Sequence, residues 1–254
     1  MDKRQNYIGK TGLMVFARSP AHYYAEFLDP ERERTPSTPT QLFGTLVHSL
    51  ILEPDTFEAR YAIVPEEMNK RKKEWEIFQN EHVGKTLVSG EDYKRAKGMQ
   101  AAVYRNKNAA ALLKNGVAEK DIFAHDPETG SLIKIRPDYY IRNAGIILDI
   151  KTTIDARPEA FQRDVYKFKY HVQDALYRDV ADWAGYLVEK FIFIAVEKEP
   201  PYGVALYELQ PTAIEMGRNT YREPLNRYAE CVKNDMWECY PEACTLLSLP
   251  AWAK

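Results

Sequence analysis

The stretch IRPDYYIRNAGIILDIKTT, residues 135–153, decides the fold of this chain. Its two apolar halves are rich in Ile and Tyr, and the turn sequence RNAG separates them. Isoleucine and tyrosine favour β-strands, whereas Asn and Gly favour tight turns. The stretch therefore predicts two strands that fold back against each other.

The same strand pattern occurs on both sides of this stretch. The earlier segment DIFAHD is followed by the turn DPETG, and the later segments FIFIAVE and YGVALYEL are separated by Glu199, Pro200 and Pro201. Short apolar segments bounded by turn residues predict strands. The expected strands are 121–126, 132–142, 146–152, 191–197 and 202–209. We expect the first three to form a meander.

Helical patterns precede, interrupt and follow these strands. Pro20 leads into a short helix, Thr40 is expected to cap an apolar, buried helix, and Pro211 is expected to begin the last one. The expected helices are 21–27, 41–52, 66–80, 90–113, 158–183 and 211–236. This order predicts an α/β or α+β domain, in which helices flank a mixed central sheet. No linker-like segment divides the chain, so we expect a single domain over 1–254 with a helical insertion near 54–115.

The composition is that of a globular protein without a strong overall charge. Of 254 residues, 45% are hydrophobic and 28% are charged, and the formal net charge is -2. This balance argues against a generally basic surface for nucleic acids but leaves room for a local basic groove. The sequence lacks an apolar run of the ~18 residues that a membrane span needs, and its start does not resemble a secretory signal. The three cysteines suggest reduced thiols, so we expect a cytoplasmic protein without membrane contact.

Asp138, Asp149 and Lys151 are the first candidates for chemistry. Asp149 and Lys151 are two residues apart in one expected strand, so their side chains project from the same face. The turn at 142–145 can bring Asp138 beside Asp149. Two carboxylates on one face repel each other unless a cation lies between them, and oxygen ligands suit Mg²⁺ or Mn²⁺. A lysine beside such a site can position or deprotonate a water and offset negative charge in a phosphorane-like transition state.

A plain ion pair between surface aspartates and a lysine would explain the same residues. Asp149, however, lies within the apolar run GIILDI, where an ionised carboxylate is costly without a partner or a metal.

Two further features accompany these residues. His48 follows Gly44 by four residues on the expected buried helix, and Gln173 and Tyr177 are four apart on the expected long helix, so the latter two share a face. Taken alone, His48 could be a hydrogen-bonded core residue, and the Gln173–Tyr177 pair could be packing.

The order of these motifs resembles the PD-(D/E)xK nuclease superfamily, in particular its RecB-like branch. The matching motifs are Gly44-Thr-Leu-Val-His48, Pro137-Asp138, Asp149-Ile-Lys151 and Gln173-Asp-Ala-Leu-Tyr177. The phrases FGTLVHSLILEP, IRPDYY, LDIKTT and YHVQDALYRD look similar to exonuclease VIII (RecE-type) nuclease domains. The resemblance covers most of the chain, and it implies a restriction-endonuclease-like core.

The resemblance also implies roles for individual residues. His48, Asp138, Asp149 and the Ile150 carbonyl would bind a divalent metal, Mg²⁺ or else Mn²⁺. Lys151 would orient the attacking water, although Asp149 stands where the pattern also allows Glu. Gln173 and Tyr177 would contact the DNA backbone or the catalytic lysine, and Arg136 and Thr152 are candidate phosphate contacts.

The implied activity is Mg²⁺-dependent digestion of duplex DNA ends. Proteins of this family resect DNA 5′ to 3′ and leave a 3′ single strand for an annealing protein during phage-type recombination. They form homo-oligomeric rings, and a ring would reconcile a net charge of -2 with DNA binding because only its channel needs to be basic. The alternatives are a structure- or site-specific DNA endonuclease of the same fold and a DNA-end-binding module without cleavage.

Two remaining features have competing interpretations. The basic run Lys70, Arg71, Lys72 and Lys73 could be a solvated helix face balanced by nearby glutamates, or an arch that touches DNA phosphates. Some RecB-like nucleases carry a four-cysteine iron–sulfur cluster, but this sequence has only Cys231, Cys239 and Cys244, so we expect none.

Overall fold

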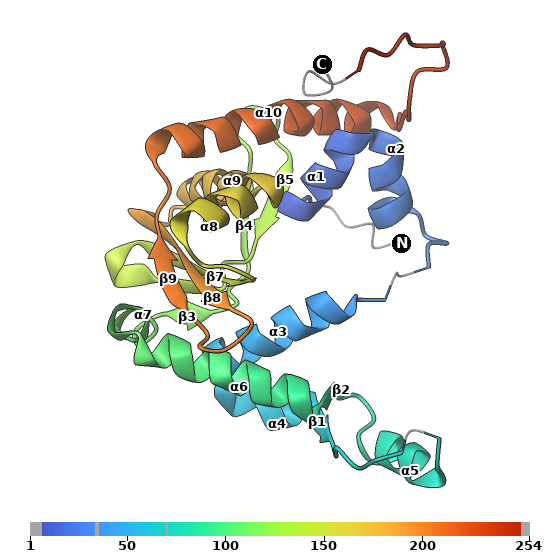
Figure 1. The fold of residues 1–254 in the computed structure, drawn as a ribbon. Coiled ribbons are helices and arrows are strands. Elements are labelled where there is room, and N and C mark those ends of the chain that lie inside the picture. The colour runs from blue at the N-terminus through green and yellow to red at the C-terminus, as the bar shows by residue number, and fades with distance from the viewer. Residues whose placement is uncertain (1–6, 34–35, 70, 250–254) are drawn as a thin grey trace.

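A central mixed sheet organises the structure, a computed structural model that describes residues 7–33, 36–69 and 71–249. The strand order is β3-β6-β7-β8-β9, with only β7 and β8 parallel to each other. The bounds are Val117–Ala118 (β3), Tyr139–Ile141 (β6), Ile146–Thr153 (β7), Lys190–Glu197 (β8) and Val204–Tyr207 (β9). The expected mixed sheet flanked by helices is confirmed (Figure 1).

The expected three-strand meander is wrong. Segment 132–142 forms two strands, β5 (Leu132–Ile135) and β6, and β5 pairs with β4 (Ile122–His125) in a separate two-stranded sheet. The break falls at Pro137, which lacks an N–H and cannot continue a ladder of hydrogen bonds. The chain leaves one sheet there and enters the other, with Asp138 at the entry.

The expected single helix over 158–183 is also wrong. The structure has α8 (Pro158–Lys167) and α9 (Tyr170–Trp183), separated by Phe168 and Lys169. Lys169 has a φ of 57°, a left-handed conformation that ends the helical path. Two helices with different directions can cover more of the sheet than a single straight one.

Most of the other helices begin close to their expected positions, but the expected helix 66–80 is wrong in its first half, because α5 (Lys73–Glu81) begins only at Lys73. Helix α3 (Pro39–Leu52) is capped by Thr38 instead of Thr40, because Thr38 and Gln41 form a reciprocal capping box around Pro39. Its second half is buried and its first half exposed, so the expectation of a fully buried helix holds only for the second half. The expected helix 90–113 divides at Asn106, whose side chain caps the second part. The two parts are α6 (Gly90–Arg105) and α7 (Lys107–Leu112).

Helices cover both faces of the central sheet. This is possible because successive apolar side chains of β7 point to opposite faces, so each face offers an apolar surface for packing. Leu148 and Ile150 pack in a core with α3 and α6, whereas Ile147 packs in a second core with Phe161 and Val165 of α8. This alternation follows from the two-residue period of a strand.

A third core joins the first helices of the chain to the last helix. Helix α1 (Lys10–Arg18), α2 (Pro20–Tyr23) and the π-helical turn η1 (Tyr24–Leu28) pack with α9, the β4–β5 hairpin and α10 (Pro211–Asn234). Figure 1 shows α10 running over α9 toward α2. The last helix begins at Pro211 as expected.

The insertion near 54–115 is not wholly helical. After η2 (Pro54–Thr56) and α4 (Phe57–Arg60) come β1 (Tyr61–Val64), α5 (Lys73–Glu81) and β2 (Thr86–Ser89), and β1 and β2 form a two-stranded parallel sheet. Helix α5 buries no residue and lies at the far end of this insertion (Figure 1). Among the described helices, none combines the length and apolarity needed to cross a membrane.

The close approach of α9 and α10 depends on Gly217. A Cβ atom at this position would lie 2.1 Å from the carbonyl oxygen of His171. Gly217→Ala is therefore expected to lower the free energy of unfolding by about 3 kcal/mol, because the two backbones must move apart. Urea denaturation measures this change.

Gly44→Ala is the matched control, because Gly44 is also helical but its Cβ would meet nothing within 4 Å. Alanine favours a helix over glycine by up to about 1 kcal/mol, so this variant should be at least as stable as the parent. Equal stability of the two variants would contradict the tight α9–α10 contact.

Candidate active site

The strand register brings three carboxylates into one row. Tyr139 pairs with Leu148 in β6–β7, and Ala118 pairs with Tyr139 in β3–β6. Continuing both antiparallel registers by one residue places Asp138 between Asp149 and Glu119. The N–H of Glu119 donates to the Asp138 carbonyl (3.0 Å), which confirms this continuation on the β3 side.

Asp138 is held as a carboxylate by groups from two elements. Its Oδ2 accepts a hydrogen bond from the Ile150 N–H (2.7 Å) and lies 3.3 Å from His48 Nδ1 of α3. Burial opposes ionisation, but His48, Lys151 and the Ile150 N–H outweigh burial, so the pKa of Asp138 lies below its ordinary value. Burial lowers the pKa of His48 and Asp138 raises it, with a net rise.

Asp149 is the most deeply buried acidic residue of this row, with an exposed fraction of 1%. Its Oδ2 lies 2.5 Å from Lys151 Nζ, and its Oδ1 accepts a hydrogen bond from Gln173 Nε2 (2.5 Å). Burial raises the pKa of Asp149 to about 6, although Lys151 opposes this rise. For Lys151, the two aspartates outweigh burial and raise its pKa, so it carries a proton at neutral pH.

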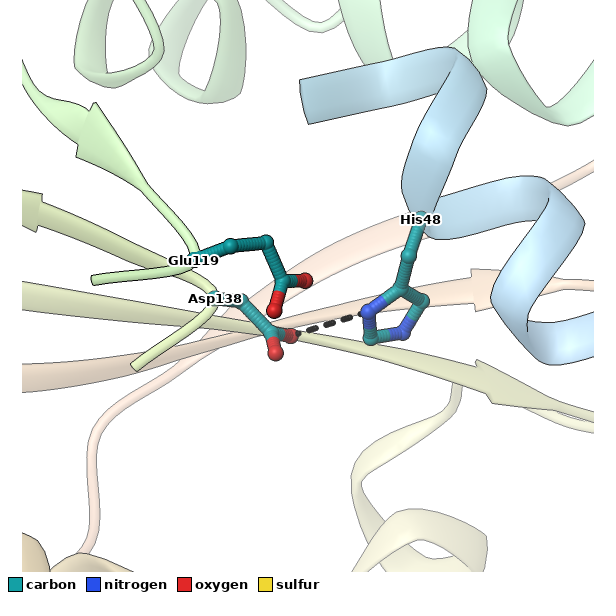
Figure 2. A group of neighbouring side chains, drawn as sticks. All are labelled: His48, Glu119 and Asp138. Carbon is teal, nitrogen blue, oxygen red and sulfur yellow. Dashed lines mark ion pairs between the residues drawn. The ribbon is translucent and has the colours of Figure 1, made fainter. Parts of the chain in front are cut away.

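Glu119 is a site residue that the sequence analysis missed. Ligand atoms of His48, Glu119 and Asp138 all lie within 4.8 Å of one another. Figure 2 shows the three side chains converging from α3, from the end of β3 and from the start of β6. Burial and the neighbouring Asp138 raise the pKa of Glu119, and His48 and Arg136 oppose this rise only in part.

These residues fit a divalent metal. The close group combines two carboxylates with one imidazole, and Asp149 adds a third carboxylate beside Asp138. Oxygen ligands suit Mg²⁺ and Mn²⁺, and imidazole binds transition metals more readily than Mg²⁺. The structure brings His48 and Asp138 together, whereas Asp149 contacts Lys151 and Gln173, and the role of all three as metal ligands stays a prediction.

Gln173 and Tyr177 lie on one face of α9, as their spacing predicts. Gln173 contacts Asp149 directly, and the Tyr177 hydroxyl donates to the Arg136 carbonyl (3.4 Å). Burial, followed by Asp149 and Asp138, raises the pKa of Tyr177. Gln173 therefore positions a carboxylate in this structure, and contacts with DNA stay a prediction for both residues.

A cavity of about 330 Å³ lies beside Gln173 and Tyr177, and three of its lining residues are basic. Lys10, Lys134 and Arg136 line it together with Gln173 and Tyr177. Lys10 Nζ donates to the Phe168 carbonyl (2.9 Å). Burial, and next the charge of Lys151, lower the pKa of Lys10 to about 8.

The structure places the other residues predicted to contact phosphate or metal in three different environments. Arg136 is half exposed and paired with Asp121, at 2.5 Å from Nε. Thr152 neighbours Lys151 on β7, and alternation along the strand directs it to the opposite face. Ile150 has a buried side chain and supplies its N–H to Asp138, so the role of its carbonyl stays a prediction.

The basic run lies at the start of α5, far along the insertion from the carboxylate row (Figure 1). Arg71, Lys72 and Lys73 are exposed, and Lys70 lies outside the described residues. Cations at a helix N-terminus oppose the helix dipole, although Glu74 and Glu76 follow in the first turn. Helix stability alone therefore does not explain these cations.

A salt titration distinguishes the two interpretations of this run. If the run contacts DNA, Arg71→Gln, Lys72→Gln and Lys73→Gln combined should weaken binding to all sequences alike. The slope of log K against log salt should flatten by up to ~0.9 per lost contact, because fewer counterions are released. Fluorescence anisotropy with labelled duplex measures both effects. An unchanged slope would indicate a solvated helix end.

The site residues that the sequence analysis missed are not marked by any strong pattern in the sequence. Glu119 follows a strand of only two residues, and Lys10 begins a helix 141 positions away from Lys151 by sequence number. Neither residue belongs to a periodic or motif-like pattern. Of the three cysteines, Cys231 is half-buried near the end of α10, and Cys239 and Cys244 are exposed free thiols.

Comparison with known proteins agrees with this geometry. A family model described as "PDDEXK-like domain of unknown function (DUF3799)" matches residues 10–250. No curated protein matches the chain. Among solved structures, a "putative exonuclease" from Eubacterium rectale is 17% identical, with a TM-score of 0.66 over 96% of this chain and 90% of that one. The structure of SSO0001 is 16% identical, with a TM-score of 0.29 over 72% of this chain and 86% of that chain.

The E. rectale structure shows a shared fold, and the family match spans nearly the whole chain. The chain belongs to this PDDEXK-like domain family, and with it to the PD-(D/E)xK nuclease superfamily.

Proposed function

We propose that this protein is a metal-dependent exodeoxyribonuclease of the exonuclease VIII (RecE) type, which digests duplex DNA 5′ to 3′ from its ends. The observation that carries the proposal is the site itself. His48 and Asp138 meet at 3.3 Å, and Lys151 and Asp149 meet at 2.5 Å, in the order of the nuclease motifs. The direction of digestion and the ring-shaped assembly rest on the resemblance of these motifs to that family.

The chemistry of the site suits phosphodiester hydrolysis. His48, Glu119, Asp138 and Asp149 would hold a divalent ion, Mg²⁺ or Mn²⁺, which when bound activates water and offsets charge on the phosphate. Asp149 and Asp138 raise the pKa of Lys151, so its ammonium form would donate a hydrogen bond to the attacking water or the phosphate. The hydrogen bond from Gln173 holds the Asp149 carboxylate in one orientation, so the carboxylate is already positioned before a metal or substrate binds.

The cavity beside Gln173 supports a polyanionic substrate. Lys10, Lys134 and Arg136 line it together with Gln173. Asp121 pairs with Lys134 (2.9 Å) and with Arg136 (2.5 Å), so phosphates of a DNA strand that enters the site would meet Lys10 and would compete with Asp121 for the other two cations. The single-strand annealing protein, the ring and a role in phage-type recombination belong to the same proposal.

Digestion of labelled DNA tests this function. Linear duplexes with a 5′ or a 3′ label and covalently closed circles are incubated with Mg²⁺, with Mn²⁺ or with a chelator. We expect early release of the 5′ label, intact circles, and no release in the presence of the chelator. Cleavage of circles at the rate of linear DNA would favour an endonuclease, and binding to ends without release would favour an end-binding module.

A further inference from the structure

The turn between α8 and α9 alternates aromatic rings with lysines. Its sequence is Tyr166-Lys167-Phe168-Lys169-Tyr170, and we call these five residues the α8–α9 corner. The left-handed conformation of Lys169 turns the chain there, and Phe168 is 44% exposed. A single exposed aromatic residue is ordinary, but aromatic rings interleaved with cations are the combination that binds single-stranded nucleic acid.

A stack of rings connects the corner with the carboxylate row. Lys151 Nζ lies 4.7 Å from the centroid of the Tyr170 ring, and the Tyr170 ring stacks on Phe168 with centroids 5.7 Å apart. Tyr170 also stacks on Phe193 of β8, at 5.8 Å, which anchors the stack on the central sheet. Phe168 is therefore only one ring away from the lysine of the catalytic site, and a base that stacks on Phe168 lies close to the phosphodiester that Lys151 contacts.

The backbone of the corner is tied to the cavity at the start of α1. Lys10 lines this cavity, and its Nζ donates to the Phe168 carbonyl (2.9 Å). An ammonium has three N–H donors, so two more can donate to a phosphate oxygen. Lys134 and Arg136 of the same cavity are each paired with Asp121. A phosphate can thus bind Lys10 without displacing Asp121.

Lys167 lies where a nucleotide would replace it. Its Nζ is 5.2 Å from the centroid of the Phe168 ring, and the residue is exposed. A cation over an exposed ring is held weakly. A nucleotide brings both a flat base for the ring and a phosphate for the ammonium, so both partners of this contact gain a new one.

We propose that the α8–α9 corner binds an unpaired nucleotide of the DNA strand whose phosphodiester enters the carboxylate row. The base stacks on Phe168, and the phosphate accepts hydrogen bonds from Lys10. This inference rests on the proposed nuclease function, and it adds that the strand is separated from its complement at the site.

The recessed position of the catalytic groups favours a separated strand. The side chains of Asp149 and Lys151 are only 1% and 16% exposed. A single strand can follow such a recess more easily than a duplex, which carries a second backbone. Unpairing costs free energy, and stacking of the released base on an aromatic ring returns part of it.

Two oligonucleotides that differ only in their bases test the site. One labelled single strand carries ordinary nucleotides, and the other has the same phosphates on abasic sugars. Fluorescence anisotropy is measured with a chelator present, which prevents digestion. The parent should bind the ordinary strand on the order of tenfold more tightly, because the abasic strand cannot stack. Phe168→Ala should lose most of this preference, and Phe168→Trp should keep it. A parent without the preference, or an alanine variant that retains it, would overturn the proposal.

Tyr166→Ala is the matched control. Tyr166 is a 65% exposed aromatic residue of the same corner, but it stacks on His171 (6.0 Å) and lines a different cavity, between α8 and α10. This variant should bind both strands like the parent, and circular dichroism checks the fold of every variant. An equal loss in Tyr166→Ala and Phe168→Ala would contradict the assignment of the base to Phe168.

Lys10→Gln tests the phosphate contact. It should weaken the binding of both strands by the same factor, because both carry phosphates. The slope of log K against log salt should flatten by up to ~0.7, the value for one contact with a single strand. Weaker binding of the ordinary strand alone would refute the phosphate contact, since Lys10 would then only support the corner.

Digestion of linear duplex by the same proteins separates this inference from the nuclease activity. Phe168→Ala should raise KM on the order of tenfold with little change in kcat, because the ring touches a base and not the reacting phosphate. A parent that releases nucleotides without preferring the ordinary strand would refute the nucleotide site alone. A parent with the preference but without release would support the site and contradict the nuclease.

Discussion

Asp138→Asn is expected to lower the rate of DNA digestion by roughly 10³-fold, the largest loss that we expect from a single substitution in this protein. Asparagine keeps the shape of the side chain but carries no negative charge. It therefore weakens the attraction for a divalent ion and for protonated His48, which lies 3.3 Å from Asp138. Release of acid-soluble nucleotides from linear duplex measures the loss, and calorimetric titration with Mn²⁺ measures metal binding.

The stability of this variant provides a second readout. Because neighbouring groups hold the pKa of Asp138 below its ordinary value, the ionised carboxylate favours the folded state, and its loss should lower stability slightly. Asp149→Asn should not lower the stability of the folded state, because burial raises the pKa of the Asp149 carboxyl to about 6 and so disfavours its ionised form. The sequence alone suggests that both changes relieve repulsion, and the structure restricts that relief to Asp149.

Asp92→Asn is the control for charge loss, since Asp92 lies in the first turn of α6 on the insertion. It should digest DNA like the parent. If Asp138→Asn bound Mn²⁺ and digested DNA as the parent does, the proposed site would be wrong.

Lys151→Ala should reduce digestion by about 10²-fold, the second largest effect. The substitution removes the ammonium that lies 2.5 Å from Asp149 and that would face the attacking water. Without this cation the pKa of Asp149, already about 6, should rise further, because burial is then less opposed. Metal binding should accordingly be weaker near pH 6.5 and approach the parent near pH 8.5, where the carboxyl ionises.

Lys190→Ala is the matched control for Lys151→Ala. Lys190 begins β8 beside Ile146, at the opposite end of the β7–β8 pair, and is largely exposed. The same loss of charge there should leave both digestion and metal binding unchanged. Digestion by Lys151→Ala within tenfold of the parent would contradict a role for this lysine in the reaction.

The local motifs could be predicted from the sequence because they depend on short-range geometry. The two-residue period of a strand places Asp149 and Lys151 on one face, and the four-residue helical spacing places Gln173 and Tyr177 on one face of α9. The turn at 142–145 was sufficient to predict that Asp138 lies beside β7.

The predictions of secondary structure were wrong where a continuous apolar or helical pattern is divided between two elements that pack on different parts of the fold. Pro137 interrupts an apolar run that otherwise looks like one strand, and Lys169 adopts a left-handed conformation within an otherwise helical pattern. In both cases long-range packing decides whether the chain continues or turns, and a periodic pattern does not contain that information.

The sequence by itself determined strands β7, β8 and β9 of the central sheet and the nuclease motifs with their order, because alternation, turn residues and spacing act within a few positions. Only the tertiary structure decided that Glu119 joins His48 and Asp138, and that Lys10 comes near enough for the charge of Lys151 to lower its pKa. These contacts link residues far apart in the chain, and they exist only once the two-residue strand β3 pairs with β6 and the first helix packs on α9. Such pairings are selected by the burial of whole surfaces, so no local sequence pattern specifies them.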